Sequence, residues 1–127
     1  LISMFAGTFA ALATLLAAIG LYGVLAYTVS QRTREIGIRM ALGASERAIL
    51  VQFLFESAAI CLIGGLMGLL LAVGVTEIIN RMLMPASISP GIVVVALLVS
   101  SLTGVAAGVV PAYRASRLDP IDALRYE

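Results

Sequence analysis

The chain has 127 residues, of which 61% are hydrophobic and 12% are charged, and its eight arginines and seven acids leave a net charge of +1. A water-soluble domain carries about 25% charged residues, so this composition excludes a soluble globular domain and predicts a membrane protein. The small net charge gives no indication of nucleic-acid binding. Lysine and histidine are absent, which excludes a phosphate-binding lysine and removes the commonest general base and metal ligand.

Three stretches predict membrane helices, over residues 1–30, 46–80 and 90–113. Each overlaps an uncharged run (1–30, 57–76 and 86–113) that reaches the ~20 residues needed to span a bilayer core. The first helix is longer than a bilayer requires, because its residues extend about 45 Å at the helical rise. We therefore expect it to tilt strongly or to project beyond the membrane as a stalk. The expected fold class is all-α, with three transmembrane helices.

Capping residues separate the predicted helices. Gly43 suits a helix end and Ser45 suits the N-cap of the second span. Ser89 suits an N-cap before Pro90, which would occupy the first helical position. Asp119, which is followed by a second proline, predicts a short C-terminal helix beyond the third span.

Two glutamates and a cysteine mark the second span. Glu56 and Glu77 bracket its charge-free stretch, so we expect both to lie at membrane boundaries. If Glu56 faces the bundle, we expect it to pair with an arginine or a backbone group. Cys61 is expected to be a small core residue, with a redox or lipidation site as the alternative.

Rows of small residues at spacings of three and four predict faces on which helices pack closely. For the row in the first span, chance enrichment of alanine is the alternative explanation. The candidate packing residues are Ala10, Ala13, Ala17 and Gly20 in the first span, Gly64 and Gly68 in the second, and Gly104 and Gly108 in the third.

The arginines predict the orientation of the chain in the membrane. Four lie in or beside the segment 31–45 and three lie in 114–127, whereas only Arg81 lies in the loop 81–89. Because cytoplasmic loops carry the excess of basic residues, we expect the first two segments to be cytoplasmic and the loop to be extracytoplasmic.

The segment 31–44 (QRTREIGIRMALGA) is an island of charge between apolar spans. It is compatible with a helix, because Glu35 and Arg39 have the favourable i,i+4 order. Its apolar side chains occupy two different faces, Ile36 with Met40 and Ile38 with Leu42. Such a segment suits docking on a protein, and arginine clusters also bind anionic lipid headgroups, so the residues alone leave both partners open.

The same segment resembles the signature of the FtsX-like, or MacB-type, permeases of ABC transporters. The ending 111–127 (PAYRASRLDPIDALRYE) resembles the C-terminus of that family, and QFLFE at 52–56 followed by Gly64-Gly65 is similar to its penultimate helix. The resemblance covers the chain in order and implies a permease with four membrane helices, of which helices two to four are present. Because the chain begins at Leu1, we expect a fragment whose missing part holds helix one and an extracytoplasmic domain.

The resemblance implies a permease subunit that transmits cytoplasmic ATP-driven motion across the bacterial inner membrane to an extracytoplasmic domain, for efflux or export. The alternative is a non-transporting regulator or scaffold of the FtsX cell-division type. Residues 19–27 are more similar to orphan permeases of the family than to MacB, so the ATPase is either fused or separate.

The resemblance also implies partners and a site. The expected partners are a nucleotide-binding ATPase, which holds the ATP, a second permease copy and the lipid bilayer, with a periplasmic adaptor as a further candidate. The expected ATPase-coupling segment comprises Arg32, Arg34, Glu35, Ile36, Gly37, Arg39, Met40, Leu42 and Gly43.

No catalytic residue, metal ligand or cofactor is expected within the chain. An intramembrane enzyme would have to use Glu56, Glu77, Asp119 or Asp122. The two glutamates fall at predicted boundaries and the two aspartates at a predicted helix start, and no histidine accompanies them. We instead expect Glu35 and Arg39 to matter for coupling.

Overall fold

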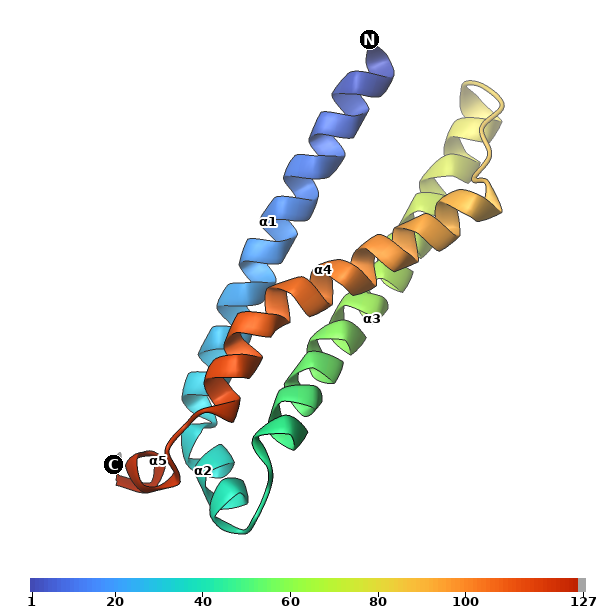
Figure 1. Cartoon of the computed structure of the whole chain (residues 1–127). Coiled ribbons are helices and arrows are strands. Elements are labelled where there is room, and N and C mark those ends of the chain that lie inside the picture. The colour runs from blue at the N-terminus through green and yellow to red at the C-terminus, as the bar shows by residue number, and fades with distance from the viewer. Residues whose placement is uncertain (126–127) are drawn as a thin grey trace.

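The computed structural model describes residues 1–125 and consists of five helices joined by short connections (Figure 1). The helices are α1 (Ile2–Gln31), α2 (Thr33–Ala41), α3 (Glu46–Met82), α4 (Pro90–Ser116) and α5 (Pro120–Arg125). Within these residues there is no strand, and α1, α3 and α4 are long and apolar enough to cross a membrane. The predicted all-α class with three spans is thus confirmed. Tyr126 and Glu127, the end of the predicted cytoplasmic tail, lie outside the described residues.

The helix starts follow the predicted capping residues. The Ser45 hydroxyl accepts a hydrogen bond from the Ala48 N–H at 3.2 Å, which satisfies one free donor of the first turn of α3. Ser89 does the same for α4, and Asp119 accepts from the Ile121 N–H at 2.9 Å. Gly43 adopts φ +102° just after α2, a conformation that side chains with a Cβ rarely adopt.

The far end of α4 differs from the predicted boundary at residue 113. The helix continues to Ser116, and Pro111 lies inside it. Proline removes one backbone hydrogen bond and normally ends or kinks a helix. Here the residues around and after it, Ala112 and Ala115, are fully buried, so their packing offsets the lost bond.

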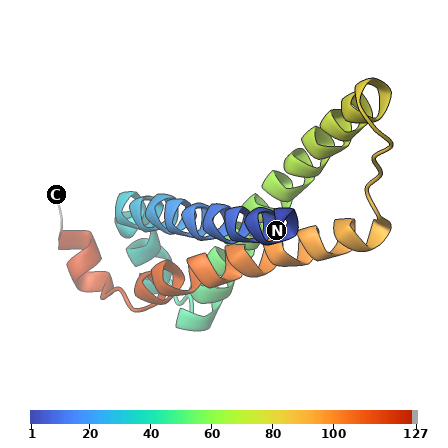
Figure 2. The same ribbon diagram turned by 90° about the horizontal axis from the view of Figure 1, so that it is seen from above.

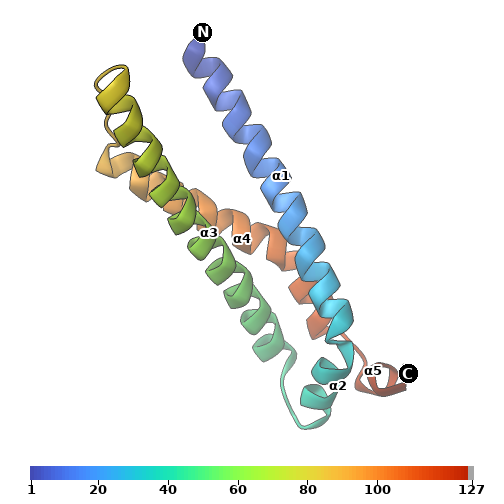
Figure 3. The same ribbon diagram turned by 180° about the vertical axis from the view of Figure 1, so that it is seen from behind.

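Helix α4 lies in the middle of the bundle, packed against α3 along one side and against α1 along another. In Figure 1 the three long helices converge at their lower ends, where α2 and α5 lie, and α1 stands apart at the N-terminus. Seen from above, α3 and α4 diverge toward the loop that connects them (Figure 2). The view from behind shows α2 and α5 together at the end opposite the N-terminus (Figure 3).

The three long helices meet at one level of the bundle. A Cβ added to Gly108 of α4 would lie 2.8 Å from the Ser57 Cβ of α3 and 3.6 Å from a δ-carbon of Leu25 in α1. About 20 residues of each helix extend from this level toward the far end, which matches a hydrocarbon core of about 30 Å. The remaining part, residues 26–56 and 109–125, is called the polar end.

Most of the buried apolar side chains lie at the polar end. They form one core to which α1, α2, α3 and α4 all contribute: Val29, Ile36, Ile49, Phe53, Ala112 and Ala115. In contrast, the most hydrophobic window of α3 has no buried residue within the described chain. Apolar side chains in a bilayer need no burial, because lipid tails are equally apolar. The burial pattern is therefore that of a lipid-facing bundle with a small core at one end.

Candidate functional site

The charged segment forms a short helix, α2, that lies across the polar end of the bundle. The chain turns between α1 and α2 at Arg32, with φ −99° and ψ 11°. The Thr33 hydroxyl donates to the carbonyls of Val29 and Ser30, both at 3.0 Å, which ties the start of α2 to the last turn of α1. These hydrogen bonds of Thr33 therefore hold the direction of α2 relative to α1.

The two apolar faces of α2 have different surroundings. Ile36 is 4% exposed and packs in the core with Ile49 and Phe53 of α3, and Met40 is half-buried against the same core. On the other side, Ile38 is partly exposed and Leu42 is 84% exposed. One face of α2 is thus anchored on α3, and the other presents apolar side chains to its surroundings.

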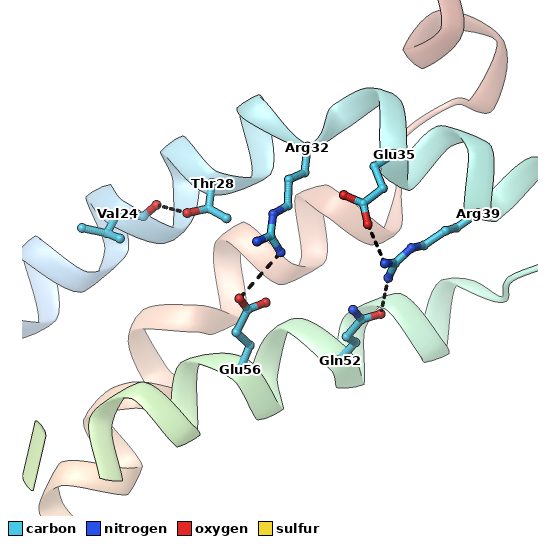
Figure 4. Close-up of polar contacts among 7 residues, drawn as sticks. All are labelled: Val24, Thr28, Arg32, Glu35, Arg39, Gln52 and Glu56. Carbon is cyan, nitrogen blue, oxygen red and sulfur yellow. Dashed lines mark hydrogen bonds and ion pairs between the residues drawn. The ribbon is translucent and has the colours of Figure 1, made fainter. Parts of the chain in front are cut away.

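Polar side chains join α2 to α3 beside this core (Figure 4). Arg39 donates to the Glu35 carboxylate at 2.5 Å and to the Gln52 amide oxygen of α3 at 3.1 Å. Arg32 and Glu56 form an ion pair with 3.8 Å between Nη1 and Oε1. We call these five residues the polar clasp. The Arg39–Gln52 bond joins α2 to α3, and the Glu35–Arg39 bond orients Arg39 for it. The Arg32–Glu56 pair links the turn before α2 to α3. Together these contacts orient α2 on α3.

Thr28, which also appears in Figure 4, bonds within its own helix instead. Its hydroxyl donates to the Val24 carbonyl at 2.9 Å. It therefore makes no contact of this kind with α3.

Energetically the clasp orients α2 more than it stabilises it. The side chains of Arg32 and Glu56 are 49% and 36% exposed, and ion pairs at that exposure are worth about 0–1 kcal/mol. The core beneath contributes more, because burying a large aliphatic or aromatic side chain is worth about 1.5–3 kcal/mol.

Reversing one charge of the Arg32–Glu56 pair tests this ranking. Arg32→Glu or Glu56→Arg is expected to lower the unfolding free energy by about 1 kcal/mol or less, and the double reversal should restore part of it. Denaturant unfolding of the four proteins in detergent measures the coupling energy. Strictly additive single effects would mean that the two side chains do not interact. The Glu77–Arg81 pair, which lies within α3, is the control.

Small residues let α3 and α4 approach closely within the apolar part of the bundle. A Cβ on Gly104 would lie 2.8 Å from the Ser57 carbonyl oxygen and 2.8 Å from the Cys61 Cβ. Gly65 of α3 faces Ser100 of α4 in the same way, and the Ser100 hydroxyl donates to the Cys61 carbonyl. Gly104 and Gly108 thus line the α4 side of the contact, and Cys61 packs within it.

The other predicted packing residues have no such neighbours in the described part of the chain. A Cβ on Gly20, Gly64 or Gly68 would have no atom within 4 Å among residues 1–125. Ala10, Ala13 and Ala17 are exposed as well. Their role in packing against another copy or helix stays a prediction.

The remaining residues of the predicted coupling segment are spread around α2. Arg34 is exposed, Gly43 forms the turn after the helix, and Gly37 is buried. Gly37 lies against Ala123 of α5, whose Cβ would be 2.6 Å from a Cβ at position 37.

Sequence reasoning missed several residues of the site. Gln52, Ser57 and Ala123 were not candidates, although each contacts a predicted residue, and Gly65 was not a candidate although it faces Ser100 of α4. The available signal was the spacing Ser57, Cys61, Gly65, which is a row of small residues at intervals of four. Among residues 1–125, no three His, Cys, Asp or Glu side chains gather closely enough to hold a metal ion.

Comparison with known proteins gives a family match along most of the chain. The model of the family described as FtsX-like permease C-terminal matches residues 7–120. A macrolide export ATP-binding/permease protein MacB from Syntrophobacter fumaroxidans is 44% identical over 110 residues, which cover 86% of this chain and 15% of that protein.

Two further relatives match a larger share of the chain. The MacB protein of Bdellovibrio bacteriovorus is 41% identical over 127 residues, or 99% of this chain and 20% of its own length. An uncharacterized ABC transporter permease, YknZ of Bacillus subtilis, is 43% identical over 122 residues, or 95% of this chain and 31% of its own length. The chain thus spans less than a third of each of these relatives.

Proposed function

Since this chain belongs to the FtsX-like permease C-terminal family, we propose that it is the membrane part of an ABC transporter permease that passes ATP-driven motion across the membrane. The chain is a multi-pass membrane protein. In the proposal, α2 contacts a nucleotide-binding ATPase on the cytoplasmic side of the inner membrane, and α1, α3 and α4 carry the movement to an extracytoplasmic domain. ATP binds to the ATPase and not to this chain.

The observation that carries the proposal is the asymmetric environment of α2. Its inner face is fixed to α3 by Ile36 and by the polar clasp, so α2 and the polar end of α3 move together. Its outer face exposes Ile38 and Leu42 on the part of the chain that lies beyond the apolar spans. Apolar side chains exposed outside the bilayer suit a protein interface.

Protein contact is favoured over lipid contact for this face. From the level of Ser57, α3 extends through about ten residues before it reaches the connection to α2, which is roughly 15 Å along the helix axis. That distance exceeds the depth at which apolar side chains enter the headgroup boundary, about 5–10 Å. In the proposed topology, Leu42 therefore lies beyond the bilayer interface, where an apolar partner would be a protein surface.

The relatives named as ATP-binding/permease proteins support an ATPase as that partner. We further propose that the complete protein assembles as a dimer, in which exposed small-residue rows such as Gly64 and Gly68 have neighbours from outside this chain. A periplasmic adaptor is a candidate partner of the extracytoplasmic domain.

The test is the double variant Ile38→Glu/Leu42→Glu in the full-length protein with its ATPase. We expect normal membrane insertion but a loss of permease-stimulated ATP hydrolysis on the order of tenfold, because charged side chains would replace the apolar contact. The control is Leu83→Glu/Met84→Glu, which alters two exposed apolar residues just after the far end of α3. Unchanged stimulation in the α2 variant would refute the proposed contact.

A further inference from the structure

Helix α5 lies directly against α2, although 78 or more residues separate them in the sequence. Leu118 packs on the core of the polar end, and Asp119 caps the first turn of α5 with its side chain. Ala123, in the middle of α5, is 3% exposed. A six-residue helix is not stable by itself, so its position depends on these contacts.

The backbones of α5 and α2 approach each other closely at Gly37 and Ala123. A Cβ on Gly37 would lie 2.6 Å from the Ala123 Cβ, and 3.7 Å from the Pro120 carbonyl oxygen and the Ala123 Cα. Side chains essentially never approach that closely, so only glycine at 37 and a small residue at 123 allow the two helices to touch as they do.

With this contact, α2 is packed against α3 on one side and against α5 on another. Successive residues of an α-helix point about 100° apart. Ile36 therefore points to α3, Gly37 points to α5, and Ile38 points to the third side, which is exposed. With α3 and α5 on two sides, α2 can rotate neither toward one nor toward the other without loss of a contact.

We propose that α5 is a positioning element for α2: through the Gly37–Ala123 contact it sets the orientation in which α2 presents Ile38 and Leu42. This inference rests on the proposed function, because the orientation matters only if that face contacts the ATPase. Gly37 and Ala123 are then positioning residues that act through α2 and touch neither nucleotide nor cargo.

A cycle of two small substitutions tests the contact. Gly37→Ala adds one methyl group that overlaps Ala123, and Ala123→Gly removes the opposing methyl group. Alanine is a better helix former than glycine, so Gly37→Ala strengthens α2 itself while it displaces α5. The double variant Gly37→Ala/Ala123→Gly leaves room for both helices and should behave like the native protein. Gly23→Ala is the control, because a Cβ there meets no atom of the described chain within 4 Å.

Two readouts in the full-length protein with its ATPase distinguish displacement of α5 from loss of coupling to the ATPase. Trypsin cleavage after Arg117, identified by mass spectrometry of the released fragment, reports displacement of α5, because the segment that leads into α5 must open before cleavage. ATP hydrolysis stimulated by the permease reports coupling. We expect Gly37→Ala to speed cleavage and to lower stimulation, each at least threefold, and the double variant to restore both.

The outcomes distinguish this inference from the proposed function. If Gly37→Ala changes neither readout, or if the double variant restores neither, α5 does not position α2. Faster cleavage without loss of stimulation would show that α5 rests on α2 without a role in coupling and would overturn the proposal as well. If Ile38→Glu/Leu42→Glu fails to lower stimulation, the ATPase contact itself is wrong, whereas the cleavage readout still reports on α5.

Discussion

Gly104→Ala is expected to lower the unfolding free energy of the bundle by about 1–3 kcal/mol, the usual cost of overpacking a tight contact. The added methyl group would lie 2.8 Å from the Ser57 carbonyl oxygen and 2.8 Å from the Cys61 Cβ. A backbone oxygen cannot rotate away as a flexible side chain can, so α3 and α4 must separate. Between helices in lipid, close packing provides much of the attraction, and separation of the axes removes it along the whole contact.

Unfolding of the purified protein by a denaturing detergent, titrated into mild detergent micelles, measures this loss. Gly74→Ala on α3 is the matched control, because a Cβ there has no neighbour within 4 Å among residues 1–125 and alanine favours the helix. We expect the control to be as stable as the native protein or slightly more so. Equal stability of the Gly104 and Gly74 variants would mean that α3 and α4 lie farther apart than the structure places them.

Local signals were sufficient to predict where α3, α4 and α5 begin and where α2 ends. The Ser45, Ser89 and Asp119 caps follow from side-chain oxygens that reach backbone N–H groups two or three residues later, and Gly43 follows from the positive φ that its turn requires. All of these interactions lie within one turn of the chain. The continuation of α4 past Pro111 was not predictable in this way, because distant core residues stabilise it.

The sequence predicts that α3 has a face of small residues for close packing, but it does not predict which row of small residues contacts α4. On α3, two rows of small residues lie side by side, one through Gly64 and Gly68 and one through Ser57, Cys61 and Gly65. Both satisfy the spacing rule, and only the second contacts α4. The position of α4 decides between them, and that position depends on contacts along the whole helix. A spacing rule states that a row can pack and not which neighbour it meets.

The candidate site shows the same division between local and distant contacts. The Glu35–Arg39 bond is an i,i+4 pair and was predicted from spacing alone. For a Glu56 that faces the bundle, an arginine or a backbone group was expected as partner; that the partner is Arg32 depends on the turn between α1 and α2. The contacts of Arg39 with Gln52 and of Gly37 with Ala123 join separate helices, so no local pattern indicates them.

Phe53→Ala is expected to cost about 3–5 kcal/mol of unfolding free energy, the range for truncation of a buried phenylalanine. Phe53 is 5% exposed and lies in the polar-end core with Ile36 of α2 and Ile49 of α3. In the proposed topology this core lies on the cytoplasmic side of the bilayer, so its burial would remove side chains from water and contribute hydrophobic stabilisation. The cavity left by alanine would also free Ile36, so the hold of α3 on α2 would weaken together with the stability.

Phe55→Ala is the matched control. It is the same substitution two residues further along α3, at a side chain that is 77% exposed. Surface changes of this kind usually stay within about 0.5 kcal/mol. Detergent unfolding of both variants, with permease-stimulated ATP hydrolysis in the full-length protein, measures the difference. We expect Phe53→Ala to lose both stability and stimulation. If Phe55→Ala costs as much as Phe53→Ala, then Phe55 is covered by a neighbour outside residues 1–125, and the anchor of α2 does not reside in the polar-end core alone.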